Sequence, residues 1–82
     1  MADEELLARI VVNPRVMVGK PVIRGTRLTV TLILNLLAHK MTVSEILAEY
    51  PSLVEDDIHA CLLFAKTAME DITYMPLILE TA

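Results

Sequence analysis

The residues best suited to chemistry in this 82-residue sequence are five cations in its first third. They are Arg9, Arg15, Lys20, Arg24 and Arg27. Residues 1–27 carry these five cations against three acids, a net charge of +2, whereas residues 28–82 carry two cations against eight acids, a net charge of −6. Guanidinium and ammonium groups bind phosphates, so any anionic partner should meet the first third of the chain. The overall charge of −4 argues against unselective binding of polyanions.

Three adjacent acids offer some of these cations a structural role instead. Residues 55–57 are Glu-Asp-Asp and begin a predicted helix, where the helix dipole favours carboxylates. Arg27 paired with Asp57 or Asp56 would satisfy both charges and hold the N-terminal segment against that helix. We favour this structural role for Arg24 and Arg27, although all five cations stay candidates for binding nucleic acid.

The remaining polar residues do not suggest catalysis, a metal or a cofactor. His59 and Cys61 are two residues apart on a predicted helix, so they point about 200° apart and cannot hold one ion. Cys61 is the only cysteine, which excludes an intrachain disulfide and suits a reducing cytoplasm. The acidic N-terminus lacks the features of a signal peptide, and the longest apolar run, Val30 to Ala38, is too short to span a membrane. We therefore expect a cytoplasmic protein that is not an enzyme.

Residues 9–28 are predicted to form a small β-hairpin arm that carries the cations. β-Branched stretches at residues 10–12, 16–18 and 22–23 alternate with the turn sequences Asn13-Pro14 and Gly19-Lys20-Pro21. We interpret all three stretches as extended, with Lys20 at the tip of a turn where a partner can reach it. Because so small a β element is marginal in water, it must lie on the helices or on another chain.

Three helices are predicted after the arm, at about residues 29–39, 43–50 and 55–72. Thr29 can cap the first helix, and Thr42 with Glu45 forms a capping box at the start of the second. Pro51 ends the second helix. The third helix has an apolar stripe that should face the core: Ile58, Cys61, Leu62, Ala65, Met69 and Ile72.

The second and third helices and the turn between them form a helix-turn-helix arrangement, which with the first helix matches a three-helix DNA-binding pattern. A recognition helix should begin with side chains that bind phosphates or base edges, but this one begins with carboxylates. We therefore interpret the helix-turn-helix as scaffold. The predicted fold is mainly α: a three-helix bundle with an N-terminal β-hairpin arm. It forms one domain over residues 9–72, between a tail or short helix at 1–8 and an apolar tail at 73–82.

Aliphatic residues are more abundant than so small a domain can bury. Hydrophobic residues make up 55% of the chain, so apolar patches stay exposed or are covered by another chain, most simply in a twofold homodimer. Leu63 stands on the outer side of the third helix, where polar residues are expected. The candidate contacts with a partner or second subunit are Leu63, Leu77, Ile78 and Leu79.

One block of the sequence is distinctive enough to indicate a family. Residues 19–28 read Gly-Lys-Pro-Val-Ile-Arg-Gly-Thr-Arg-Leu, and residues 50–53 read Tyr-Pro-Ser-Leu. With Ile10-Val11-Val12-Asn13-Pro14 and the run from Val30 to Ala38, they make the segment from Ile10 to Ile72 resemble a prokaryotic family known as domain of unknown function 433. The resemblance covers about three quarters of the chain.

The resemblance implies a homeodomain-like three-helix fold behind a small β element. It also implies an antitoxin of the Vap B type that binds a PIN-like ribonuclease toxin. The alternatives are a homo-oligomeric adaptor module without nucleic-acid binding and a helix-turn-helix transcription regulator. Two residues depart from the family pattern: Lys40 stands where glycine would suit a left-handed helix stop, and Val54 is a poor N-cap, for which Ser52 is the alternative.

Overall fold

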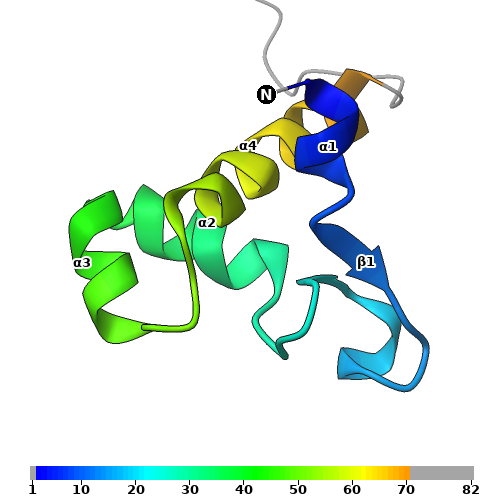
Figure 1. The fold of residues 1–82 in the computed structure, drawn as a ribbon, viewed down its shortest axis with the longest axis horizontal. Helices are drawn as coiled ribbons and strands as arrows, with labels where there is room; N and C mark the ends of the chain where they lie inside the picture. The colour runs from blue at the N-terminus through cyan, green and yellow to red at the C-terminus, as the bar shows by residue number, and fades with distance from the viewer. Residues whose placement is uncertain (1, 71–82) are drawn as a thin grey trace, which may run out of the picture.

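The computed structural model describes residues 2–70 of the chain. In this part, four α-helices and one two-stranded sheet follow the order α1 (Asp3–Leu7), β1 (Ile10–Val12), β2 (Pro21–Ile23), α2 (Val30–Ala38), α3 (Val43–Glu49) and α4 (Glu55–Glu70). Helix α4 packs against α1, α2, α3 and β1. The hairpin and α3 lie at opposite ends of the molecule (Figure 1). The predicted mainly α fold with a small N-terminal hairpin is confirmed. The predicted end of the third helix at Ile72 lies outside the described residues.

The hairpin is short and depends on the helices for its stability. Strands β1 and β2 pair antiparallel, with Ile10 opposite Ile23 and Val12 opposite Pro21. The side chains of Ile10 and Ile23 are both buried in the core, and a bridge from Val22 to Thr29 extends the pairing beyond β2. Three residues a strand would not be stable alone, so the packing of β1 on α4 and of β2 on α2 holds the hairpin in place.

The loop between the strands differs from the prediction. Residues 16–18 were predicted to be extended, but residues 17–19 form a single 3-10 turn, η1 (Met17–Gly19). Three successive residues there have left-handed backbone angles: φ is 49° at Met17, 55° at Val18 and 77° at Gly19. The prediction was wrong because it weighed the β preference of valine above the turn residues on both sides.

An asparagine side chain starts this loop. The Oδ1 atom of Asn13 accepts a hydrogen bond from the backbone N–H of Arg15 at 2.9 Å, and the Asn13 carbonyl accepts one from the N–H of Val16, also at 2.9 Å. Pro14 stands between them, where its fixed φ suits the second position of a turn. The chain therefore leaves β1 in a tight turn that projects Arg15 outward.

Helix α2 begins and ends with local hydrogen bonds. The Oγ1 atom of Thr29 accepts a hydrogen bond from the N–H of Leu32 at 3.0 Å, which confirms the predicted cap. At the other end, Lys40 has a φ of 71°. Its N–H donates to the carbonyl of Leu37, and the N–H of Met41 donates to that of Leu36, each at 3.0 Å. This is a Schellman motif, so the helix stops in the left-handed conformation although lysine occupies the glycine position.

The starts of α3 and α4 use side-chain acceptors in different ways. Thr42 and Glu45 form the predicted capping box, with both side chain to backbone hydrogen bonds present at 3.1 Å and 2.9 Å. Helix α4 begins at Glu55, not one turn earlier as a Ser52 cap would require. The carboxylate of Asp57 accepts the N–H of Val54 at 2.9 Å and so replaces the missing cap.

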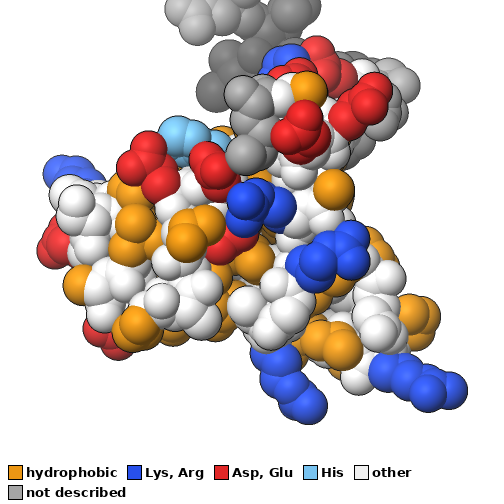
Figure 2. Space-filling model, viewed as in Figure 1, with side chains coloured by type: hydrophobic (Ala, Val, Ile, Leu, Met, Phe, Trp, Pro, Cys, Tyr) orange, Lys and Arg blue, Asp and Glu red, His pale blue; other side chains and the backbone are white. Residues whose placement is uncertain are grey.

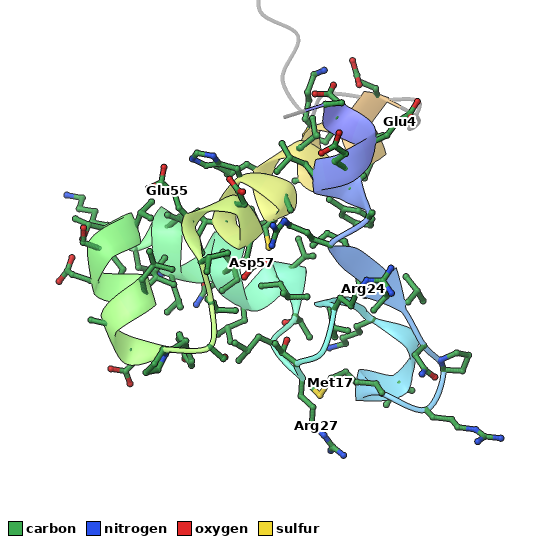
Figure 3. The ribbon with its side chains drawn as sticks, in the orientation of Figure 1. Glu4, Met17, Arg24, Arg27, Glu55 and Asp57 are labelled. Atoms are coloured by element: carbon green, nitrogen blue, oxygen red, sulfur yellow. The ribbon has the colours of Figure 1, made fainter. Side chains whose placement is uncertain are left out.

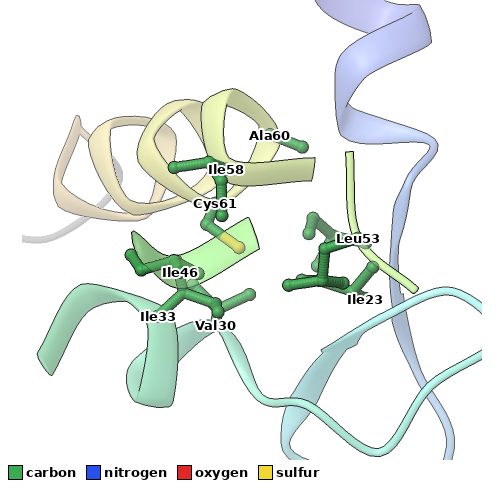
Figure 4. Close-up of a cluster of buried hydrophobic side chains, with 9 residues drawn as sticks. Ile23, Val30, Ile33, Ile46, Leu53, Ile58, Ala60 and Cys61 are labelled. Carbon is green, nitrogen blue, oxygen red and sulfur yellow. The ribbon is translucent and has the colours of Figure 1, made fainter. Parts of the chain in front are cut away.

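A single apolar core joins the hairpin to the helices. It consists of Ile10, Ile23, Val30, Ile33, Ile46, Leu53, Ile58, Ala60 and Cys61, and Figure 4 shows most of them meeting between α2, α3 and α4. Ile58 and Cys61 of the predicted α4 stripe are fully buried. Leu62 and Met69 are not: 47% and 63% of their surfaces are exposed, so the prediction that they face the core is wrong. Among the described helices, none is long and apolar enough to cross a membrane.

Candidate nucleic-acid interface

The structure separates the five candidate cations into two groups. Arg9 and Arg24 lie where α1, the hairpin and α4 meet. Arg15 and Lys20 are exposed in the loop that joins β1 to β2, and Arg27 is exposed in the turn that follows β2, where Figure 3 shows its side chain pointing away from the protein. The two groups carry different hydrogen bonds, and these decide which cations are free to bind a partner.

Arg9 makes the ion pair that was predicted for Arg27. Its Nη1 atom lies 3.1 Å from Oδ1 of Asp57, and its Nη2 atom lies 3.7 Å from Oδ2 of Asp56. The Asp57 side chain is 10% exposed and that of Arg9 is 34% exposed. Sequence reasoning had the correct acids but the wrong arginine, because the extended hairpin carries Arg27 away from α4. Asp57 thus joins β1 to α4 and caps α4 with the same carboxylate.

Arg24 also holds chain segments together. Its backbone N–H donates to the carbonyl of Arg9 at 2.7 Å, and its Nε donates to the carbonyl of Ala8 at 3.0 Å. A hollow of about 390 Å³ lies beside these groups and is lined by Glu5, Ala8, Arg9, Arg24 and Asp57. With two carboxylates in its lining, this hollow is a poor place for a phosphate. The structural role favoured for Arg24 is therefore supported by its contacts.

A tight turn presents Arg27 to solvent. The N–H of Thr26 donates to the carbonyl of Ile23 at 3.0 Å, and Gly25, with a φ of 79°, takes the position that requires a left-handed residue. The Thr26 hydroxyl donates to the same carbonyl at 2.8 Å and accepts the N–H of Leu28 at 3.0 Å. The Gly-Thr-Arg block of the sequence is therefore a turn that aims Arg27 outward.

We use the name hairpin end for Arg15, Met17, Val18, Lys20 and Arg27. All five are exposed, and Val18 is 93% exposed. Figure 3 shows Met17 and Arg27 at the same extremity, where the Arg27 side chain points away from the protein. Sequence reasoning missed Met17 and Val18 because it placed them in a strand. The signal that could have revealed them is the glycine directly after them in a turn-rich segment.

Charge is distributed unequally over the molecule. In Figure 2, Lys and Arg side chains project from the hairpin end at the bottom, whereas most Asp and Glu side chains gather over the upper part. Glu4 and Glu55 mark this acidic side in Figure 3. A negatively charged partner would therefore be attracted to the hairpin end and repelled by the start of α4.

The residues predicted to contact a protein partner are either half-buried or outside the described part of the chain. Leu63 is half-buried on α4, and the large exposed apolar side chains of that helix are Leu62 and Met69. Leu77, Ile78 and Leu79 lie outside the described residues. Leu62 and Met69 are therefore the α4 side chains with free apolar surface, and the sequence pattern had assigned both to the core.

Cys61 is a poor nucleophile in this fold. Burial and, to a smaller extent, the negative charge of Asp57 raise the pKa of its thiol to about 12. The thiolate, the reactive form, is therefore absent near neutral pH. Cys61 is better described as a small apolar residue of the core.

The fold and site define a small helical domain with an exposed, cationic β-hairpin. A model of the family "Protein of unknown function (DUF433)" matches residues 10–65, and the chain belongs to this family. A search of curated proteins finds no match. Among solved structures, the crystal structure of a DUF433 member protein from Anabaena variabilis ATCC 29413 is similar, with a TM-score of 0.73 and 28% sequence identity. The match covers 82% of this chain and 66% of that protein, so the chain spans slightly less than two thirds of its length.

Proposed function

We propose that this protein is an antitoxin-like binding protein that binds operator DNA through the hairpin end and a PIN-like nuclease toxin through a separate apolar surface. The observation that carries the DNA part is the exposure of Arg15 and Lys20 in the loop between β1 and β2 and of Arg27 in the turn that follows β2. The fold uses Arg9 and Arg24 to join its own segments. Exposed cations on projecting turns are suited to phosphate contacts.

A homodimer would strengthen such binding. Each hairpin end supplies three cations, so two copies on one duplex would double the number of phosphate contacts. β-Ribbons are known to enter the grooves of DNA, which gives a short hairpin a route to the bases. The exposed side chains of Leu62 and Met69 offer apolar surface for a second subunit or for the toxin.

Reading of DNA by α4 is the less favoured mode. In a homeodomain-like arrangement of α2, α3 and α4, the start of α4 would approach the major groove. That start carries Glu55 and Asp56 at the surface, and carboxylates there would repel phosphates. Asp56 and the neighbouring Asp57 serve the fold through their contacts with Arg9. The proposal therefore assigns the helices to scaffold and the hairpin end to DNA.

A second candidate function is a homo-oligomeric adaptor that does not bind nucleic acid. The observation that favours it is the exposed apolar surface of α4, where Leu62 and Met69 are 47% and 63% exposed. An adaptor would use this surface alone, and the cations of the hairpin end would then only be solvated. DNA binding by the isolated protein distinguishes the two candidates.

Co-expression with the neighbouring gene tests the antitoxin role. The neighbour is expressed from an inducible promoter in a heterologous host, with and without this protein. We expect the neighbour alone to arrest growth, and co-expression to restore growth and to yield a complex of both proteins on size-exclusion chromatography. If the neighbour arrests growth and this protein neither relieves the arrest nor co-elutes with it, the antitoxin role is wrong.

A further inference from the structure

The tip of the hairpin holds two apolar residues in a conformation that neither prefers. Met17 and Val18 have φ values of 49° and 55°, and Val18 is β-branched, for which the left-handed region is a true outlier. Glycine or asparagine would adopt these angles at little cost. The chain nevertheless places a methionine and a valine there.

Two backbone hydrogen bonds close this turn, from the N–H of Gly19 to the carbonyl of Val16 and from the N–H of Lys20 to that of Met17, but within the described part of the protein the two apolar side chains add little packing. Val18 is 93% exposed and Met17 is 41% exposed, and neither contributes to the core. A strained conformation of exposed apolar residues weakens the isolated fold, and such strain gathers where a partner is bound. The shape of the turn therefore points to a partner that buries these two side chains.

The surrounding charges describe that partner. Arg15 lies before the apolar pair, Lys20 lies after it, and Arg27 projects from the adjacent turn at the same extremity (Figure 3). Arg27 also shares a hollow of about 430 Å³ with Asn13 and Val16, on the flank of the hairpin. The apolar side chains of the tip would meet an apolar surface of the partner, and the cations around them would meet negative charges on both sides of that surface.

We propose that Met17 and Val18 form a wedge that enters the minor groove of duplex DNA and partly unstacks a base step. Arg15, Lys20 and Arg27 would hold the phosphates on both sides. This inference rests on the proposed DNA binding and specifies its mode. The minor groove is about 6 Å wide, and apolar side chains inserted there as wedges bend DNA. Two side chains are too few to anchor the protein in a bilayer, which argues against an anionic membrane as the partner.

The matched variants Val18→Asn and Val54→Asn test the wedge. Asparagine tolerates the left-handed conformation, so Val18→Asn removes the apolar tip and relieves its strain while all charges stay in place. Val54 is 51% exposed directly before α4 and lies outside the hairpin, so Val54→Asn makes the same chemical change at a site with no role in the wedge. Each protein is titrated onto an end-labelled, A·T-rich duplex of roughly 30 bp with a central TpA step, a flexible step, and bending is measured by fluorescence energy transfer.

We expect the wild type and Val54→Asn to bind and bend the duplex equally. Val18→Asn should lose the bend and about tenfold in affinity, the factor that burial of one valine side chain supports. Its salt dependence should be unchanged, because the phosphate contacts remain. Its thermal midpoint should rise, which shows that the variant is folded.

Each other outcome overturns the wedge. If Val18→Asn binds and bends DNA like the wild type, the wedge is wrong and the proposed DNA binding stands. If the wild type does not bind the duplex, both are wrong. Equal loss of bending in Val54→Asn would contradict a role specific to the tip, and preferential binding of the wild type to phosphatidylserine vesicles would identify a membrane as the partner.

Discussion

The buried carboxylate of Asp57 should contribute a large part of the stability of the fold. The Asp57 carboxylate, 10% exposed, accepts hydrogen bonds from Arg9 at 3.1 Å and from the N–H of Val54 at 2.9 Å. A hydrogen bond to a charged group contributes about 1.5–3 kcal/mol. Taking the lower value for each bond, because Arg9 is partly exposed, we expect Asp57→Ala to lower the free energy of unfolding by about 3 kcal/mol. This is a large fraction of the roughly 5–15 kcal/mol typical of small domains.

Urea unfolding followed by circular dichroism measures this effect and separates its parts. Asp57→Asn keeps an acceptor for the N–H of Val54 but loses the charge. Its free energy of unfolding should therefore lie between those of the wild type and Asp57→Ala. A double-mutant cycle of Arg9→Ala and Asp57→Ala should give a coupling energy of about 1–2 kcal/mol. Arg27→Ala is the matched control and should change stability by less than about 0.5 kcal/mol. A cost below about 1 kcal/mol for Asp57→Ala, or equal costs for the Arg9 and Arg27 variants, would refute this reasoning.

Three further predictions concern single residues. Lys40→Gly should raise the free energy of unfolding by about 0.5–1 kcal/mol, because glycine relieves the left-handed strain at a φ of 71°; a loss of stability in urea would contradict this. Hydrogen bonds from Thr42 hold the pKa of Glu45 below its usual value, so the stability that its charge provides is present above the unfolded pKa of 4.5 and is lost as pH falls through the lowered pKa. The stability difference between the wild type and Glu45→Gln should therefore shrink in acid, and a constant difference would refute it. For Cys61 the pKa is raised from 9.0 to about 12, so the unfolded chain ionises first and stability should fall as pH rises from 9 to 12, a fall that Cys61→Ala should lack. Iodoacetamide should not label the folded protein at neutral pH.

Much of the fold was predictable because its signals are local. The Thr29 cap and the Thr42–Glu45 capping box mark helix starts through hydrogen bonds within one turn, and such bonds depend little on the rest of the chain. Pro51 marks a helix end because proline lacks a backbone N–H. The alternation of valines with turn residues predicted a β-hairpin arm over residues 9–28, and the observed strands β1 and β2 lie within it. The error at Val18 arose where two local signals conflicted, and the turn residues prevailed over the β preference.

The site was less predictable because it depends on distant contacts. Asp57 meets Arg9 across 48 positions of the chain, and its partner follows from the direction in which β1 leaves α1. Spacing along the sequence does not give that direction, so Arg27 was as good a candidate as Arg9 for the partner of Asp57. Leu62 and Met69 were assigned to the core stripe, yet Leu62 lies on an exposed side of α4 beside the buried Cys61, and Met69 lies beyond Phe64, which still packs against the core. An apolar stripe in a helix sequence shows which side chains share a face. It does not show which parts of that face the neighbouring elements cover.

The central claim is that the hairpin end binds DNA through Arg15, Lys20 and Arg27, and the salt dependence of binding tests it most directly. The affinity for the DNA upstream of the gene is measured at several salt concentrations for the wild type, for the triple variant Arg15→Ser, Lys20→Ser and Arg27→Ser, and for Lys66→Ser, an exposed lysine on α4. The logarithm of the wild-type binding constant should fall linearly with the logarithm of salt concentration. The triple variant should lose about 2.7 from that slope for each bound subunit, at roughly 0.9 for each phosphate contact, and Lys66→Ser should lose none. A flat wild-type line, or a triple variant that keeps the full slope, would contradict the claim.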